Sequence, residues 1–546
     1  AGTPNHLLAG LVEGALEEPP RVEESLPEAF RARHRLAGAA ESYRAIHFPE
    51  DEAALEAARR RFAFEELFYL SLGLALLRER RSRGAGPSFP EADPAGFYGL
   101  LPFSLTAAQR RAAEEAAADL RSPRPMNRLV QGDVGSGKTA VAAACAWMAH
   151  QAGWQSAMMA PTELLAQQHF HTITALLEPA HMTVGLLTGS MRAAEKRKVL
   201  SALQSGDIHL VVGTHALLSQ GVEFRRLGLV ITDEQHRFGV EQRAALAAKA
   251  NTPGDPADAA PEENFSPNVL VMSATPIPRT LALIIYGDLD VSVIDELPPG
   301  RKPVQTFLIG ESKRQRLYGF VRAQVQEGRQ VYLVCPAVEE NPEGAWDLKA
   351  VNEYARVLRE EVFPDLRVGL VHGKLKARDK EAAMAAFTAG ETDVLVSTTV
   401  IEVGVDVPNA SLIVIENADR YGLSQLHQLR GRVGRGQHQS WCILVSDNRS
   451  PDTRARLKVL TETTDGFKIA EEDLKLRGPG DFFGARQHGP PALRVADLNT
   501  DTRVLKEAQE GAAGLLAEDP DLSRPEHRPL LERVRRLFDQ DPDRFN

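Results

Sequence analysis

The chain has 546 residues, which is too many for a single hydrophobic core, so we expect two or three domains. A hydrophobic fraction of 43% and a charged fraction of 25% are typical of folded globular proteins and exclude a largely disordered chain. The formal net charge of -10 argues against a protein that coats nucleic acid by bulk electrostatic attraction, but it leaves room for a local basic track.

Three cysteines, Cys145, Cys335 and Cys442, lie far apart, each within an apolar segment. This spacing indicates neither a disulfide framework nor a metal site, and it suits a reducing compartment. No run approaches the roughly 20 apolar residues of a membrane span, and the N-terminus lacks the pattern of a signal peptide. We therefore predict a cytoplasmic location and no membrane partner.

The N-terminal part of the chain, residues 1–100, is predicted to be a segment without strands followed by a linker helix. Residues up to 49 are rich in Glu, Pro and Arg. A long helix is predicted over residues 51–83, because apolar side chains recur there at helical spacing: Phe64, Leu67, Phe68, Leu72 and Leu76. Glycine and proline in the RGAGP that follows would end it.

Short apolar runs then alternate with helix-length segments, the pattern of a parallel sheet. The first series is RLVQ at 128, SAMMAP at 156, HLVVGTH at 209, LGLVITDE at 227 and VLVMSAT at 269. The second is VYLVCP at 331, VGLVHG at 368, DVLVSTT at 393, SLIVIEN at 411 and SWCILVS at 440. The predicted fold class is therefore α/β, with two parallel-sheet domains of similar design at residues 101–295 and 296–464.

Two further stretches differ in composition from these domains. Residues 251–268 are polar and proline-rich, which indicates a surface insertion, and we assign them no chemistry. Residues 465–546 have helical and irregular patterns and form the last predicted region.

The segment GDVGSGKT has the spacing of a phosphate-binding loop, with an apolar strand before it and an alanine-rich helix after it. Backbone amides can surround the β-phosphate, Lys138 can reach the γ-phosphate, and the Thr139 hydroxyl can ligate magnesium. We expect ATP to be held by the loop residues Gly132, Asp133, Gly135, Ser136, Gly137, Lys138 and Thr139.

An acidic pair, Asp233 and Glu234, ends the predicted strand LVITDE. In an open α/β sheet the nucleotide lies at the carboxyl ends of the strands. Asp233 would hold magnesium, while Glu234 would orient and deprotonate the attacking water. Alone, such a pair is usually a solvated strand end, but the phosphate loop upstream makes the catalytic interpretation the stronger one.

A basic motif, QLHQLRGRVGRG, begins at Gln425 in the second predicted domain. Arg432 and Arg435 are three residues apart and share one face if the segment is helical. Two arginines brought from another domain could stabilise the charge that develops on a γ-phosphate during hydrolysis. The alternative is a basic helix on the protein surface.

The order of these motifs resembles the motif set of superfamily-two helicases, which have two RecA-like domains with ATP between them. The matching elements are GDVGSGKT, APTELLAQQH, VGTHALL, DEQH, SATPIPR, VSTTVIEVGVDVP and QLRGRVGRG. Within that superfamily, DEQHRFGVEQR from Asp233 and LKLRGPGDFFGARQHG from Leu474 resemble the RecG family of branched-DNA helicases. IHFP at 46 and FEELFYLSLGLALLR at 64 agree, and the likeness extends from about residue 28 to 495.

The resemblance implies roles for further residues. Adenine would be bound by Phe103 and Gln109, and Gln428, Arg432 and Arg435 would complete the ATP site. Nucleotide binding would be coupled to DNA by Ser273, Thr275, Gly404 and Asp406. The DNA backbone would run along Thr162, Thr188, Thr214 and His215. A translocation hairpin and loop after residue 465 would include Arg477 and Gln487.

The function that the resemblance implies is that of an ATP-dependent DNA helicase or double-stranded DNA translocase. It would use ATP and Mg²⁺, act as a monomer, and remodel branched DNA such as stalled forks and four-way junctions in recombination and repair. The family also carries an oligonucleotide-binding barrel ahead of the linker helix. The residues before Ile46 are too few and too poor in strand patterns to form one, so we expect this wedge to be absent. Two explanations stay open: the sequence is a fragment of a longer protein, or its junction recognition is reduced.

Three alternative functions stay open. A transcription-repair coupling factor shares the RGPGDFFG-like motif, although the QH after Glu234 and the missing upstream domains argue against it. An RNA helicase would be distinguished by ATPase stimulation with RNA instead of duplex DNA. A nucleotide-sensing scaffold would hydrolyse nothing, which fits poorly with Lys138, Glu234 and both arginines.

Overall fold

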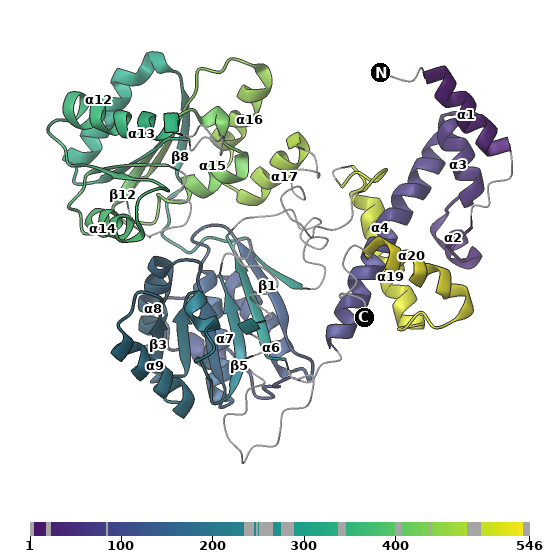
Figure 1. Cartoon of the computed structure of the whole chain (residues 1–546), viewed down its shortest axis with the longest axis horizontal. Coiled ribbons are helices and arrows are strands. Elements are labelled where there is room, and N and C mark those ends of the chain that lie inside the picture. The colour runs from purple at the N-terminus through teal and green to yellow at the C-terminus, as the bar shows by residue number, and fades with distance from the viewer. Residues whose placement is uncertain are drawn as a thin grey trace. The chain divides into compact units, whose positions relative to one another are not determined.

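In the computed structural model, the described residues are 5–17, 23–82, 86–233, 245–246, 249, 266–274, 289–336, 345–398, 407–436, 438–477, 493–498 and 500–538. They divide into two compact units (Figure 1). One contains both parallel sheets, within Gly84–Ile277 and Asp290–Asp473, and the other combines helices from the two ends of the chain. Across these ranges, no helix has the length and apolar character that a membrane crossing requires.

The first lobe is built on a seven-stranded sheet in the order β3-β4-β2-β5-β6-β1-β7, and every pairing in it is parallel. Its strands are β1 (Asn127–Gly132), β2 (Gln155–Met159), β3 (Val184–Leu187), β4 (Leu210–Gly213), β5 (Leu227–Thr232), β6 (Asn268–Ser273) and β7 (Asp290–Ile294). Its helices are α5 (Ala95–Tyr98), α6 (Ala107–Arg121), α7 (Lys138–Gln151), α8 (Glu163–Leu177) and α9 (Ala193–Ser205).

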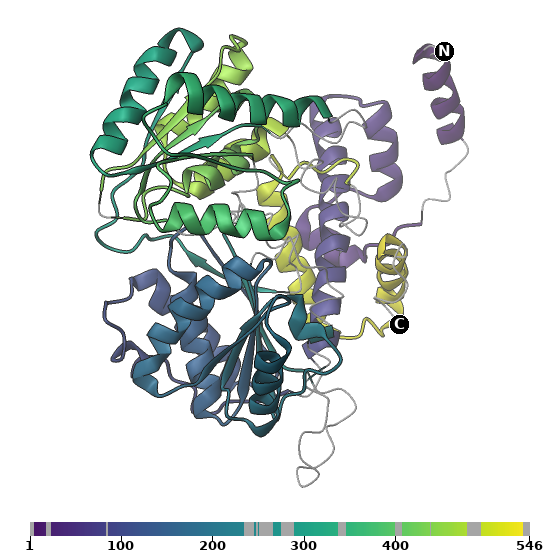
Figure 2. The ribbon, with the colours of Figure 1, turned by 60° about the vertical axis from the view of Figure 1, so that its left-hand side comes forward.

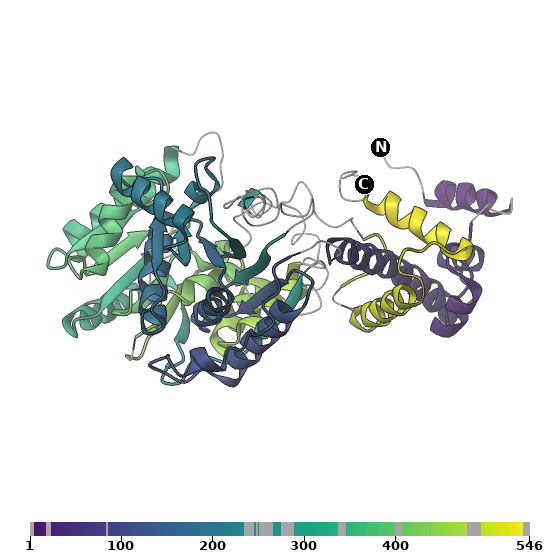
Figure 3. The same cartoon turned by 90° about the horizontal axis from the view of Figure 1, so that it is seen from below.

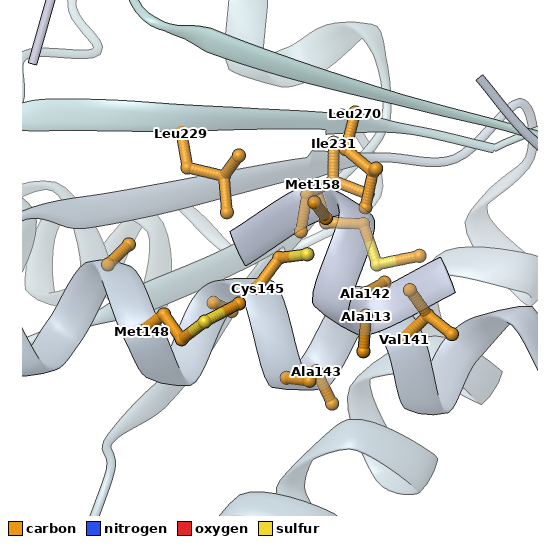
Figure 4. Packing of buried hydrophobic residues seen from close by; sticks show 14 of the residues in the cluster. Ala113, Val141, Ala142, Ala143, Cys145, Met148, Met158, Leu229, Ile231 and Leu270 are labelled. Atoms are coloured by element: carbon orange, nitrogen blue, oxygen red, sulfur yellow. The ribbon is translucent and has the colours of Figure 1, made fainter. Parts of the chain in front are cut away.

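The core of this lobe lies between α7 and the central strands. Figure 4 shows Cys145 and Met148 of α7 beside Leu229, Ile231 and Leu270 of β5 and β6. Half of the remaining α7 residues are small alanines, so the helix backbone can approach the sheet closely and is buried on nearly all sides. This packing holds the N-terminus of α7, where the phosphate loop ends, at the carboxyl edge of the sheet.

The second lobe repeats the design with a six-stranded parallel sheet in the order β10-β11-β9-β12-β13-β8. Its strands are β8 (Gln305–Ile309), β9 (Gln330–Val334), β10 (Val368–Val371), β11 (Val394–Ser397), β12 (Ala410–Ile415) and β13 (Trp441–Val445). Figure 2 shows helices on both faces of this sheet. The helices are α12 (Arg314–Gln326), α13 (Ala345–Val357), α14 (Ala377–Thr388), α15 (Leu423–Arg430), α16 (Pro451–Glu462) and α17 (Gly466–Arg477).

The predicted α/β fold class with two parallel sheets is confirmed. All ten predicted apolar runs are strands, and the structure adds β3, β7 and β8. The three cysteines are free and buried, and burial raises the pKa of each thiol to about 12. They therefore act as small core residues.

A buried glutamine opens the equivalent strand of each lobe. The Gln155 Nε2 atom donates to the carbonyls of Leu203 and Ile208, at 3.0 and 2.7 Å. At the start of β9, Gln330 Nε2 donates in the same way to Phe387, where α14 ends, and to Thr392, which precedes β11. The two lobes thus close the same helix-to-strand junction with the same side chain.

Replacing Gln330 with alanine is expected to lower the free energy of unfolding by about 2 to 3 kcal/mol, because two buried carbonyls lose their donor. Gln330 is only 4% exposed, so water cannot easily replace the amide. Denaturant unfolding of the variant would measure the change. Gln326→Ala, at the exposed end of α12, is the matched control. Equal stability of both variants would contradict the structural role.

The helical unit is organised around the long helix α4 (Glu52–Ser82), which confirms the helix predicted over residues 51–83. The other helices are α1 (Asn5–Glu17), α2 (Glu28–His34), α3 (Ala39–His47), α19 (Thr502–Glu518) and α20 (Arg528–Phe538). Helices α19 and α20 pack along α4 (Figure 3). Glu66 of α4 also accepts hydrogen bonds from the consecutive amides of Arg494, Val495 and Ala496, at 3.0 to 3.1 Å. The sequence patterns did not indicate that the two ends of the chain pack together.

Candidate nucleotide site

The phosphate loop joins the end of β1 at Gly132 to the start of α7 at Lys138. Gly135 and Gly137 have φ angles of 76° and 83°, a region that side chains other than glycine rarely adopt. A Cβ atom at Gly137 would lie 2.2 Å from Gln109 Nε2. The glycines therefore allow a tight turn that presents the loop amides and the N-terminus of α7 to an anion.

Lys138 is buried at the base of this loop. Its Nζ atom donates to the carbonyl oxygens of Gly132 and Asp133, at 2.8 and 2.9 Å. Ser136 Oγ is also buried and has no hydrogen-bond partner among the described residues. The site thus offers a lysine ammonium group, a hydroxyl without a partner among the described residues, and a glycine turn with no room for a Cβ atom. A bound phosphate chain would suit all three features.

Gln109 connects helix α6 to the phosphate loop. Its Oε1 atom accepts from the Thr106 amide at 2.9 Å, within a capping box that begins α6. Its Nε2 atom donates to the carbonyl of Ser136 at 2.7 Å. Each amide atom keeps one further hydrogen-bonding position for a base. Phe103 is 49% exposed, and adenine binding by Phe103 and Gln109 stays a prediction.

Asp233 follows β5 at the carboxyl edge of the first sheet. Its Oδ2 atom lies 2.7 Å from Nε2 of His169, a buried residue of α8. His169 ends the motif APTELLAQQH, but its place in the sequence alone did not predict a role in the site. This contact fixes the carboxylate where a magnesium ligand is predicted. Glu234 lies outside the described residues.

The magnesium prediction depends on Thr139 and Asp233. No cluster of three or more His, Cys, Asp or Glu side chains suited to a metal occurs in the described part of the chain. Magnesium bound with ATP needs no such cluster, because it keeps several waters and takes phosphate oxygens together with one or two protein ligands. The residue types at these two positions fit that mode.

The arginine motif begins in helix α15, but the part that carries Arg432 and Arg435 is not helical, so the two arginines do not share a helix face. Helix α15 ends at Arg430, and Arg432 and Arg435 lie in the turn that follows. Gly434, with a φ angle of 78°, shapes this turn. Arg432 is buried, and Arg435 Nε donates to the Gly431 carbonyl at 3.1 Å. Gln428 is half-buried on α15.

The two lobes meet at the phosphate loop. His427 of α15 places its Nε2 atom 2.6 Å from Asp133 Oδ1, although the residues are 294 positions apart. Arg430 lies 2.9 Å from His427 Nδ1 and also donates to the carbonyls of Leu460 and Thr463. Because a guanidinium has no acceptor, Nδ1 accepts and Nε2 carries the proton toward Asp133. This network joins the loop to the arginine motif.

The Asp133 carboxylate makes the inter-lobe contact sensitive to acid. Burial opposes its ionisation, but hydrogen bonds from His427 and the Val134 amide outweigh burial and lower the pKa of Asp133. A lowered pKa stabilises the folded state above the ordinary value of 3.8 and loses that effect as pH falls through the folded value. Thermal melts should show Asp133→Asn less stable than wild type near neutral pH, with the difference shrinking below about pH 4. A constant difference across this range would contradict the assignment.

Three of the residues expected along DNA follow the carboxyl ends of three adjacent strands. Thr162 caps α8 just after β2, Thr188 follows β3, and Thr214 follows β4. Thr188 and Thr214 are buried, whereas His215 is exposed. Ser273 ends β6 and is buried. The arrangement gathers these positions at one edge of the sheet, and their contact with DNA stays a prediction.

The remaining predicted site residues lie at the end of a described helix or outside the described residues. Arg477 is the last residue of α17. Thr275, Gly404, Asp406 and Gln487 lie outside the described residues, as do residues 251–265 of the insertion predicted at 251–268. Its last residue, Asn268, is not part of a surface insertion, because it is buried and begins β6.

Two parallel-sheet lobes, a phosphate loop on one and an arginine motif from the other in contact with it, define the class of two-lobed helicases. Residues 106–284 match the family described as DEAD/DEAH box helicase, and residues 312–437 match the helicase conserved C-terminal domain. Residues 463–542 match domain 3, C-terminal, of the ATP-dependent DNA helicase RecG. The chain belongs to the RecG family.

Curated relatives named ATP-dependent DNA helicase RecG support this membership. The chain is 49% identical to the Synechocystis sp. protein over 92% of its own length and 59% of the relative. It is 45% identical to the Bacillus subtilis protein, covering 94% and 73%, and 47% identical to the Thermotoga maritima protein, covering 94% and 64%. A solved structure of RecG bound to a three-way DNA junction aligns with a TM-score of 0.74 and 41% identity, covering 93% of this chain and 65% of that one.

Proposed function

We propose that this chain is an ATP-dependent DNA helicase or double-stranded DNA translocase that acts on branched DNA. The observation that carries the proposal is the contact of His427 with Asp133, which brings the second lobe to the phosphate loop of the first. A cleft assembled from two lobes can convert the presence or absence of a triphosphate into relative movement of those lobes. Membership of the RecG family supports DNA as the substrate along which the protein moves.

In the proposed cycle, ATP binding exchanges the two carbonyl partners of Lys138 for phosphate oxygens. Magnesium, held by Thr139 and Asp233, would neutralise charge on the phosphates. Glu234 would take a proton from the attacking water. Arg432 and Arg435 would stabilise charge on the γ-phosphate from the second lobe, so that closure favours hydrolysis and hydrolysis releases closure.

DNA would be gripped at the strand ends that carry Thr162, Thr188, Thr214 and His215. Residues 465–546, with Arg477 and Gln487, would convert lobe movement into translocation. Residues 101–295 and 296–464 would be the ATP-binding and C-terminal motor domains, and residues 1–100 would be an N-terminal segment and linker helix. We propose a monomer that acts in the cytoplasm on forks and four-way junctions.

The deciding experiment measures ATP turnover with linear duplex, three-way junctions, four-way junctions and single-stranded RNA of equal nucleotide content. We expect the greatest stimulation by the junctions and little by RNA. Since phosphate contacts dominate such binding, the stimulation should fall steeply with salt. Equal stimulation by linear and branched duplex would favour a coupling-factor-like translocase, and stimulation by RNA alone would overturn DNA as the substrate.

A further inference from the structure

The segment that joins the two lobes runs along the phosphate loop. Asp295 pairs with Arg111 of α6 at 3.0 Å, and the Glu296 carboxylate accepts from the Ala108 amide at 3.2 Å. Pro298 then comes within 4.0 Å of the Cβ position of Gly137. The connection is therefore part of the surroundings of the nucleotide site.

Arg301, in this segment, bonds to both lobes with one guanidinium. Its Nη1 atom donates to the Val134 carbonyl in the phosphate loop at 2.6 Å. Its Nε atom donates to the Gly434 carbonyl in the arginine motif at 2.9 Å. The Cβ position of Gly135 lies 2.0 Å from Arg301 Nη1, so only glycine leaves room for the guanidinium against the loop.

The contact of Arg301 with the Gly434 carbonyl lies within the arginine motif. Gly434 lies between Arg432 and Arg435, and its carbonyl belongs to the peptide that leads into Arg435. The φ angle of 78° at Gly434 fixes the direction of the turn, and a Cβ there would lie 2.7 Å from Val304. Arg301 therefore holds the backbone that carries one predicted catalytic arginine against the backbone that surrounds the phosphates.

A guanidinium suits this task because its donors are fixed in one plane, so two bonds set both a distance and an angle. A lysine has a single nitrogen on a flexible stem and cannot span the two carbonyls in the same way. Small displacements of groups around a reacting centre have large effects on rate. The rigid link thus acts on the geometry of turnover more than on nucleotide binding by the loop.

We propose that Arg301 is a positioning residue for ATP turnover, which sets the separation between the phosphate loop and the Arg432 to Arg435 turn. This inference rests on the proposed function. The segment that joins the two lobes would then contribute to catalysis as well as linking the lobes covalently. ATP hydrolysis stimulated by DNA depends on the closed arrangement of the lobes and should be most sensitive to it.

The test compares Arg301→Ala and Arg301→Lys with Arg111→Ala, which removes a neighbouring anchor of the same connection. We expect kcat with junction DNA to fall about tenfold or more in both Arg301 variants, while the affinity for a fluorescent ADP changes less than about threefold. Arg111→Ala should keep the wild-type kcat. Melting temperatures of all three variants should match wild type.

Several results would overturn the proposal. A wild-type kcat in Arg301→Ala would remove the positioning role, and full activity in Arg301→Lys would show that charge suffices without the two-carbonyl link. A parallel loss of ADP affinity, melting temperature and kcat would indicate a purely structural anchor. Stimulation of the wild-type enzyme by DNA is measured separately, so failure of the proposed function and failure of this inference are distinguishable.

Discussion

Replacing Lys138 with alanine is expected to reduce ATP turnover by about a thousandfold or more, with or without DNA. The lysine is the one side chain of the phosphate loop that brings a positive charge, and its Nζ atom is held by the Gly132 and Asp133 carbonyls at the base of the cradle. When the lysine ammonium group moves from these carbonyls to phosphate oxygens, it stabilises the bound nucleotide. It also stabilises the negative charge that builds up on the γ-phosphate during hydrolysis. Steady-state phosphate release would measure the loss.

The matched control is Lys458→Ala, which removes an exposed lysine of α16 that pairs with Glu462 on the same helix. It should turn over ATP at the wild-type rate. The fold of the Lys138 variant is checked by its melting temperature, since the Gly132 and Asp133 carbonyls lose their donor. Retained turnover in a folded Lys138→Ala protein would remove the phosphate loop from the catalytic centre.

The phosphate loop and most of the fold could be predicted from the sequence because their causes are local. A strand, glycines at fixed spacing and a helix of small residues lie within about 25 consecutive positions, and the buried strands are continuous apolar runs. The missed strands are β3, β7 and β8, each of four or five residues. In β8, polar residues interrupt the pattern, and its burial is only partial. Short runs that combine polar and apolar residues have no clear period, so their sequence pattern does not distinguish them from loops.

The contacts that complete the site could not be predicted because each depends on residues far apart in the chain. His169 meets Asp233 across 64 positions, and Arg301 meets Val134 across 167. No local pattern distinguishes such a histidine or arginine from one on the surface. The turn that carries Arg432 and Arg435 is a different case, because Gly431 and Gly434 disfavour a continuous helix and could have indicated the turn.

Arg432→Ala is expected to lower kcat by about a thousandfold while the affinity for ATP changes little. The turn that carries Arg432 contacts the phosphate loop, since the Cβ position of Gly431 lies 2.8 Å from Val134 Cβ. An arginine held there by the second lobe is 8% exposed, so its charge acts in a site with little water. Its contribution should therefore arise in the transition state, when charge develops on the γ-phosphate.

The comparison that decides this point pairs Arg432→Ala with Arg449→Ala, an exposed arginine beyond β13 in the same lobe. Binding of a fluorescent ATP analogue and single-turnover hydrolysis separate affinity from rate. Slow hydrolysis with normal affinity in the first variant, and normal behaviour in the second, would mean that the second lobe supplies charge to the reaction itself. Normal hydrolysis by Arg432→Ala would instead show that Arg432 contributes no charge to the hydrolysis step, and would leave Arg435 as the arginine of the second lobe to be tested next.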